Sequence, residues 1–574
     1  MAQIFPRTRH KRLTETVFET GLILLFVVLG SVGILHHELW RDETQAWLLA
    51  RDSPSVVALF RNTRNEGHPL LWHYCLFIIS RISYSPIAMQ IFHLLLAIGS
   101  IWLIVKKSPF SLLERSLITF GYFTFYEYAL LSRSYGLGVF LTFLFCALYC
   151  GFNGSDFNGG RKRQVNKSSQ AWLMVLTLAL LANTTVLGLI LSGVLAIALY
   201  YRLFFTQPKK PRPAIWPMTC ALITAWSVSA IQIGRSLLNP MGLKGFDADA
   251  REAISVYATE PNITEPNITG SDVLTQTTDI TPLASWLDNA DKLLQIILKS
   301  HLPLPSFRFH FWNQHLLENQ GTYTVADWLM MMMSLALVGL VMLIAFLLLR
   351  KTPIFLFIYA LGGLGMCSIF VIAYRGTTRH YGNLFILLLA CLWLARWSSQ
   401  HVLRRSTGQP TSYASTNKLA NRLFTAILCV QVIAGIHAYS ADLRHPFSAS
   451  NQTAQIIKAQ FNTLPVLAIN QRPISPVSSY LNRPLFYPEA NQFGSFWSRS
   501  YPEMKDEATI TEALQAFSST HPDFIAILTR PLSLPPRTKP ATPTLEIHYI
   551  DYVGPSIVED EAFFLYRIHA VNTK

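Results

Sequence analysis

Long apolar runs alternate with short polar segments along the first 440 residues of the chain. The runs lie near residues 18–37, 69–82, 86–105, 112–131, 135–152, 171–182, 185–205, 214–236, 326–349, 353–373, 382–396 and 423–440. A helix needs roughly 20 apolar residues to cross the hydrocarbon core of a bilayer. Because most of the runs approach that length, the pattern predicts a multi-pass α-helical membrane protein.

The run 69–82 is short for a span, and its length is typical of a re-entrant or interfacial helix. If it does not cross and the N-terminus is cytoplasmic, nearly every basic cluster falls inside, as the positive-inside rule requires. These clusters are Lys106, Lys107 and Arg115; Arg161, Lys162, Arg163 and Lys167; Arg202, Lys209, Lys210 and Arg212; Arg350 and Lys351; and Arg396, Arg404, Arg405, Lys418 and Arg422. If it did cross, most of them would face outward. We therefore expect about eleven spans, with the N-terminus inside and the C-terminus outside.

This topology predicts a first external loop over 38–85 that carries a juxtamembrane helix, and a long external loop over 237–325. Asn183-Thr184-Thr185 interrupts one apolar stretch and predicts a turn at the external face; a single long tilted helix is the alternative, and it would invert the later loops. After residue 440 the chain is rich in proline, with short β-like runs at Val466–Asn470, Phe524–Thr529, Leu545–Ile550 and Phe563–Ile568 and an amphipathic stretch at Thr511–Phe517. We expect a transmembrane domain over 1–440 and a small extracytoplasmic α/β domain over 441–574.

Composition agrees with a membrane protein: 51% of the 574 residues are hydrophobic and only 14% are charged. The net charge of +14 does not indicate a nucleic-acid partner, because the basic residues sit in short loops between apolar runs. All seven cysteines lie inside apolar segments, which favours core packing. The chain has no Walker loop, no G-x-G-x-x-G and no Cys/His spacing for zinc, so a nucleotide-driven pump and a zinc protease have no support.

Four external segments that carry ionisable side chains can meet at one membrane face. They are Arg41-Asp42-Glu43; Asn65-Glu66-Gly67-His68-Pro69; Phe125-Tyr126-Glu127-Tyr128 with Ser132-Arg133-Ser134-Tyr135; and Tyr374 to Tyr381, which includes Arg379 and His380. This set suits transfer of a group from a phosphate to a hydroxyl. A carboxylate would act as general base, and arginines would take the charge that develops on the departing phosphate.

Each segment also has a plainer interpretation. Asp42 could cap the following helix, and His68-Pro69 could be a simple turn. Arg133 and Arg379 could extend to lipid headgroups, as arginines at helix ends do. Glu127 lies near the end of an apolar run between two tyrosines, where Arg133 is a plausible partner.

Three features resemble the GT-C superfamily of polyprenyl-phosphate-dependent glycosyltransferases, near the protein-mannosyltransferase and aminoarabinose-transferase families. They are the Asp42-Glu43 pair after the first span, the stretch Glu66-Gly67-His68-Pro69-Leu70-Leu71-Trp72 before the juxtamembrane helix, and the step from Arg133 to Tyr135. The resemblance covers roughly residues 18–400 and is specific in the first 140.

The resemblance implies that a sugar moves from a polyprenyl phosphate to an acceptor outside the membrane, generally with inversion. It makes Asp42 the base and Glu43 a residue that helps to position the site. Arg133, with Arg379 and His380, would hold the lipid phosphate. The predicted substrate-binding set also includes Arg41, Glu66, His68, Glu127 and Tyr135. Some relatives need a divalent metal and others do not, so metal use stays open.

The acceptor is a glycan, a lipid or a protein, and the expected location is a bacterial inner membrane. Two other functions compete with this prediction. One is a transporter or flippase for a lipid-linked intermediate, which would also need buried charged residues. The other is an inactive scaffold whose external domain binds a partner.

Overall fold

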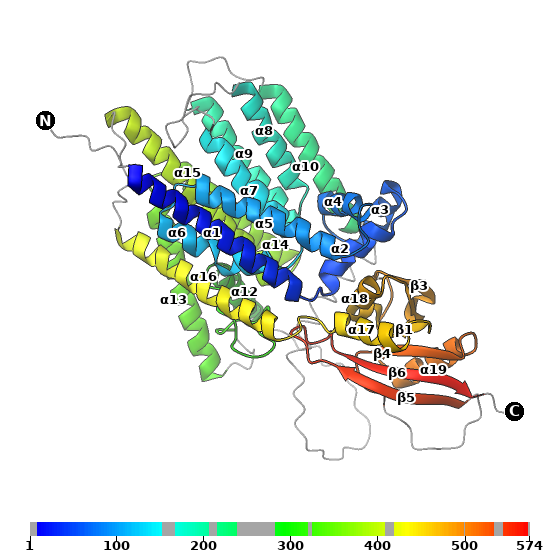
Figure 1. The fold of residues 1–574 in the computed structure, drawn as a ribbon. Coiled ribbons are helices and arrows are strands. Elements are labelled where there is room, and N and C mark those ends of the chain that lie inside the picture. Colours follow the sequence, from blue (N-terminus) through cyan, green and yellow to red (C-terminus); the bar gives the residue numbers. More distant parts are fainter. Residues whose placement is uncertain are drawn as a thin grey trace.

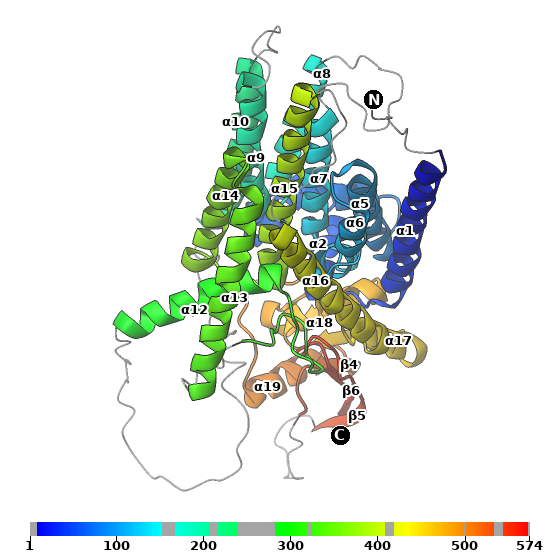
Figure 2. The ribbon, with the colours of Figure 1, turned by 90° about the vertical axis from the view of Figure 1, so that its left-hand side faces the viewer.

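The computed structural model describes residues 9–151, 167–205, 215–237, 282–318, 324–407, 418–498, 500–532 and 544–571. These ranges form a bundle of helices with a C-terminal sheet domain packed against one end (Figure 1). The start of α1 and the sheet domain lie at opposite ends of the bundle. The view turned by 90° shows the same arrangement (Figure 2).

Within the described ranges, nine helices are long and apolar enough to cross a membrane. They are α1 (Arg9–His36), α5 (Ile87–Lys107), α7 (Ser134–Gly151), α9 (Val186–Phe205), α10 (Ile215–Leu237), α13 (Val325–Leu349), α14 (Pro353–Ile372), α15 (Thr378–Thr407) and α16 (Lys418–Arg444). Their apolar windows differ in burial, from 89% in α15 to 17% in α10. Because α15 lies at the centre of the bundle, the residues of its first turn, Thr378 to His380, are buried.

Two of the expected spans differ from these nine. The run 171–182 forms the shorter α8 (Lys167–Ala182), which turns at Asn183 and packs against α9. The run 112–131 was expected as one continuous span, and that expectation is wrong. It forms α6 (Leu112–Thr119) and, after a break at Phe120-Gly121, the π-helical turn η2 (Tyr122–Glu127).

The break has a packing cause. Helix α16 crosses η2, and Gly435 of α16 lies so close that an added Cβ would come within 2.9 Å of the Phe120 carbonyl oxygen. Gly121 has an extended backbone there, which ends the first helix. All residues of η2 are buried, and the turn carries Glu127 toward the site described below.

The segment 38–85, which the sequence predicts as the first external loop, contains α2 (Arg41–Asp52), α3 (Val56–Asn62), the 3₁₀ turn η1 (Thr63–Asn65) and α4 (Leu71–Ser80). Helix α4 has 10 residues, so it is about 15 Å long and covers only half of a hydrocarbon core. This length fits the expected juxtamembrane helix. The described part of 237–325, which the sequence predicts as the long external loop, includes α12 (Pro282–His301) and the irregular segment 302–318.

The C-terminal domain is an α/β unit, as expected. Its elements are α17 (Ser450–Gln460), β1 (Val466–Ala468), α18 (Gln471–Leu481), β2 (Leu485–Tyr487), η3 (Pro488–Ala490), β3 (Gln492–Gly494), α19 (Glu507–Ser518), β4 (Asp523–Leu528), β5 (Thr544–Val553) and β6 (Phe563–Val571). The sheet order is β3-β2-β1-β4-β6-β5, with β1 parallel to β2 and β4 and the other pairs antiparallel. Separate apolar clusters cover its two faces, one under α17 and α18 and one under α19.

Candidate active site

Asp42 lies in the first turn of α2, where the bundle meets the C-terminal domain. Its Oδ2 atom accepts a hydrogen bond from Arg379 Nη2 at 2.7 Å and lies 3.6 Å from Arg133 Nη1. Arg133 also donates to the backbone carbonyl of Asp42. Three predicted residues that are far apart in the sequence therefore form one cluster.

The charge of Asp42 is strongly favoured in this cluster. Burial of the carboxyl opposes ionisation, but the guanidinium groups of Arg133 and Arg379 outweigh it and hold the pKa of Asp42 well below its usual range. Asp42 is therefore an anion at neutral pH. A carboxylate paired in this way is also a weak base, because accepting a proton would break its ion pairs.

Arg379 is held between two indole rings. Its guanidinium carbon lies 5.0 Å from the ring centroid of Trp40 and 5.6 Å from that of Trp312, which comes from segment 302–318. Its Nε and Nη1 atoms are buried and have no hydrogen-bond partner among the described residues. Buried donors are normally satisfied, so these two unpartnered N–H donors indicate places where a ligand oxygen binds.

Tyr128 and Tyr135 make further contacts around the arginines. The hydroxyl of Tyr128 donates to the backbone carbonyl of Arg379 at 2.6 Å, and the rings of Tyr135 and His380 are 5.3 Å apart. The Tyr135 hydroxyl interacts electrostatically with Arg133, Arg379 and Asp42. Tyr135 therefore lies in the cluster, as the sequence predicts.

His380 and Glu127 are placed differently from Tyr135. The Nδ1 atom of His380 accepts a hydrogen bond from the backbone N–H of Thr377 at 2.9 Å, so the imidazole caps the start of α15. Glu127 is 2% exposed and accepts hydrogen bonds from Tyr122 at 2.9 Å and from the indole of Trp312 at 3.4 Å. It lies on the interior side of the cluster, within electrostatic range of Arg379.

Glu43 is directed into the protein interior. It is fully buried, its Oε2 atom is 2.9 Å from His37 Nε2, and its Oε1 atom accepts the backbone N–H of Ser132. The other ring nitrogen of His37 is 2.8 Å from Asp442 in α16. Burial disfavours the imidazolium, but Asp442 and Glu43 raise the pKa of His37 well above its ordinary value. Glu43 therefore fixes the turn that carries Arg133.

Arg41 points toward the C-terminal domain. Its backbone N–H donates to Glu561 at 3.0 Å, and its guanidinium pairs with Asp560. Successive helical residues are separated by about 100° around the axis, so the neighbours Arg41, Asp42 and Glu43 face three directions.

The outer wall of the cluster contains residues that the sequence reasoning missed. The side-chain amide of Gln45 donates to Glu66 at 3.1 Å and to the backbone carbonyl of Trp497 at 2.9 Å, and its oxygen accepts the Trp497 N–H at 3.2 Å. The guanidinium of Arg472 lies over the Trp497 ring at 5.5 Å and interacts electrostatically with Asp42. His68 interacts electrostatically with His380, so it also belongs to this region.

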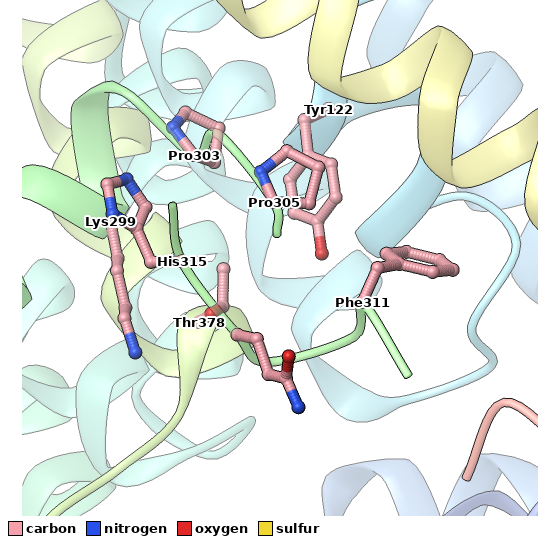
Figure 3. A pocket seen from close by; sticks show the side chains of 8 residues that line it. Tyr122, Lys299, Pro303, Pro305, Phe311, His315 and Thr378 are labelled. Atoms are coloured by element: carbon pink, nitrogen blue, oxygen red, sulfur yellow. The ribbon is translucent and has the colours of Figure 1, made fainter. Parts of the chain in front are cut away.

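Figure 3 shows a small pocket between segment 302–318 and η2. Its lining residues are Tyr122, Lys299, Pro303, Pro305, Phe311, Gln314, His315 and Thr378. It has room for about one water molecule. It adjoins the cluster, because Tyr122 binds Glu127 and Thr378 precedes Arg379, but it is not the cluster itself.

No protein-family model and no curated protein matches the chain. Among solved structures, the chain is similar to the aminoarabinose transferase ArnT from Cupriavidus metallidurans, in the apo state (TM-score 0.41) and bound to undecaprenyl phosphate (TM-score 0.43). Each match has 10% identity and covers 96% of this chain and 98% of that chain. The Archaeoglobus fulgidus oligosaccharyltransferase tethered with an acceptor peptide is similar at TM-score 0.33 and 9% identity, over 85% of this chain and 60% of that chain.

At TM-scores below 0.5 this similarity does not by itself assign an activity, which has to come from the site. Among the described residues, no group of three or more His, Cys, Asp and Glu side chains is arranged to hold a metal ion. What the cluster offers is an ionised carboxylate beside two guanidinium groups with aromatic walls. That combination binds an anion and, once the carboxylate is released from its ion pairs, accepts a proton.

Proposed function

We propose that the protein is a membrane glycosyltransferase that moves a sugar from a polyprenyl-phosphate donor to an acceptor hydroxyl on the extracytoplasmic face. The observation that carries the proposal is the cluster of Asp42 with Arg133 and Arg379 at the end of the helical bundle. A site at that level can receive the phosphate of a lipid while the polyprenyl chain stays in the bilayer. The bacterial inner membrane, with the C-terminal domain outside, is the proposed location.

The arginines bind the phosphate in this proposal. The donor is a phosphodiester, and departure of the sugar adds negative charge to the oxygen that had joined sugar and phosphate. Fixed guanidinium donors at that oxygen stabilise the transition state more than the ground state, which is the condition for catalysis. The aromatic rings of Trp40 and Trp312 hold the Arg379 guanidinium in place for this task.

Asp42 is the proposed base. A hydroxyl is a weak nucleophile until a carboxylate takes its proton. Attack on the sugar from the side opposite the phosphate gives inversion. The wall formed by Gln45, Arg472 and Trp497 lies beside Asp42 and borders the proposed acceptor side.

The test uses purified protein in detergent micelles with synthetic undecaprenyl-phosphate sugars and a cell-envelope extract as the source of acceptor. Mass spectrometry measures conversion of the donor to undecaprenyl phosphate. A transporter would leave the donor unchanged, because micelles have no second compartment, and so would an inactive scaffold. We expect conversion by the wild type and a loss of roughly 100- to 10,000-fold in Asp42→Asn.

Asp506→Asn is the matched control, because Asp506 only caps the exposed α19 in the C-terminal domain. It should convert donor at the wild-type rate. Absence of conversion by the wild type with every donor sugar would overturn the proposal. Full activity of Asp42→Asn would remove Asp42 from the role of base.

A further inference from the structure

The two arginines hold an anion that belongs to the protein itself. Arg379 donates to Oδ2 of Asp42 at 2.7 Å, and Arg133 lies 3.6 Å from the same oxygen. A phosphate oxygen and a carboxylate oxygen are alternative acceptors for the same guanidinium N–H groups. Asp42 therefore occupies the position that the proposed function gives to the donor phosphate.

Arg379 can receive a second anion before it releases the first. Only its Nη2 atom bonds Asp42, while Nε and Nη1 are buried without a partner among the described residues. The side chain of Asp42 is 16% exposed, so it is not locked by packing on every side. Asp42 also interacts electrostatically with Arg472 on the outer wall.

We propose that Asp42 is an internal anion in the donor-phosphate subsite, and that the lipid phosphate displaces its carboxylate from Arg379 and so frees it to act as the base. This inference rests on the proposed function. The two roles of Asp42 are then separated in time. Without donor the carboxylate neutralises the arginines, and with donor bound it is released toward the acceptor.

The reaction balances. The bond between the anomeric carbon and the phosphate oxygen breaks, and its electron pair stays on the phosphate, which Arg133 and Arg379 stabilise. The acceptor oxygen forms the new bond to that carbon and gives its proton to Asp42. Asp42 returns this proton to solvent when the phosphate leaves and the carboxylate again pairs with Arg379.

The experiment measures binding of undecaprenyl phosphate, without sugar, to the full-length protein in micelles. A competitor within the subsite weakens ligand binding, so its removal should strengthen it. We expect Asp42→Asn to bind undecaprenyl phosphate about tenfold more tightly than the wild type and to gain more thermal stability from it. Asp560→Asn is the matched control, because it removes the carboxylate of a different Asp–Arg pair, the one that joins Arg41 of α2 to the C-terminal domain. Its affinity should equal that of the wild type.

A second background locates the effect. In Arg379→Gln the tightening caused by Asp42→Asn should become much smaller, because only the 3.6 Å contact between Arg133 and Asp42 remains. If Asp42→Asn binds undecaprenyl phosphate as weakly as the wild type, or more weakly, the displacement is refuted while the proposed function stands. If the wild type does not bind this lipid at all, the proposed function fails with it.

A measurement on the wild type covers the case in which the variant does not fold. Undecaprenyl phosphate should increase labelling of Asp42 by a water-soluble carbodiimide, read by mass spectrometry of the peptide that contains it. Labelling of Asp506, which caps α19 at an exposed position, should not change. Equal labelling of Asp42 with and without lipid would contradict the displacement.

Discussion

Replacing Arg379 tests the cationic half of the site. Arg379→Gln removes the guanidinium that bonds Asp42 at 2.7 Å and that lies between Trp40 and Trp312. In the proposed reaction this group faces charge that develops on the departing phosphate. Loss of one such donor in other enzymes lowers the rate roughly 100- to 1,000-fold, or about 3 to 4 kcal/mol of transition-state stabilisation. We expect a loss of that size in donor conversion.

Arg379→Lys separates charge from geometry. Lysine keeps the positive charge but has no planar fork, so it cannot replace the Nη2 donor to Asp42 and the unpartnered Nε and Nη1 donors together. Its conversion rate should lie between those of the wild type and Arg379→Gln. Arg375→Gln is the matched control, since it removes an arginine four positions earlier in the same segment. The assay is donor conversion in micelles at saturating lipid, with thermal unfolding as a check on the fold. Arg379→Gln activity within about threefold of the control would refute the assigned role.

Three further variants test the surroundings of the cluster. Gln45→Ala removes the hydrogen bonds that join α2 to Trp497 of the C-terminal domain. Limited proteolysis between α16 and α17 should therefore accelerate, and donor conversion should fall. An unchanged cleavage rate would contradict the role of Gln45 in joining α2 to this domain. Glu43→Gln leaves the buried His37 with one fewer carboxylate, and the unfolding free energy should fall by about 3 kcal/mol or more, seen as a lower melting temperature. Burial raises the pKa of Glu561 to about 8, against an opposing effect of Arg41. Because this folded-state pKa lies above the unfolded value, the contribution of Glu561 to stability is complete below about pH 4.5 and is lost as the pH rises toward 8. Melting temperatures from pH 5 to 8.5 should therefore decline less in Glu561→Gln than in the wild type, and parallel declines would contradict this.

The spans were predictable because lipid imposes a simple length and polarity requirement on a helix. The break at Gly121 was not, because the aromatic residues of Tyr122–Glu127 fit a straight span as well as a π-helical turn. What decides between them is the close approach of Gly435 in α16, more than 300 positions away in the sequence. In the C-terminal domain, the four β-like runs form β1, β4, β5 and β6. The three-residue strands β2 and β3 were missed because they are too short to show an alternating pattern.

The site was partly visible in the sequence. Asp42, Arg133 and Arg379 could be selected because charges beside apolar runs are rare, and the structure brings them together. Because Asp42 and Glu43 are adjacent in the sequence, the sequence does not show which of the two carboxylates faces the arginines. It depends on His37 and Ser132, which hold Glu43 inside. The outer residues Gln45, Arg472 and Trp497 and the ring of Trp312 belong to no motif, so only the folded chain shows that they border the site.

A density map of the protein with bound undecaprenyl phosphate tests the central claim most directly. We expect the phosphate within hydrogen-bond distance of Arg133 and Arg379, with the polyprenyl chain on the lipid-facing side of the bundle and the Asp42 carboxylate moved away from Arg379. A phosphate bound elsewhere, with the ion pair between Asp42 and Arg379 intact, would contradict it.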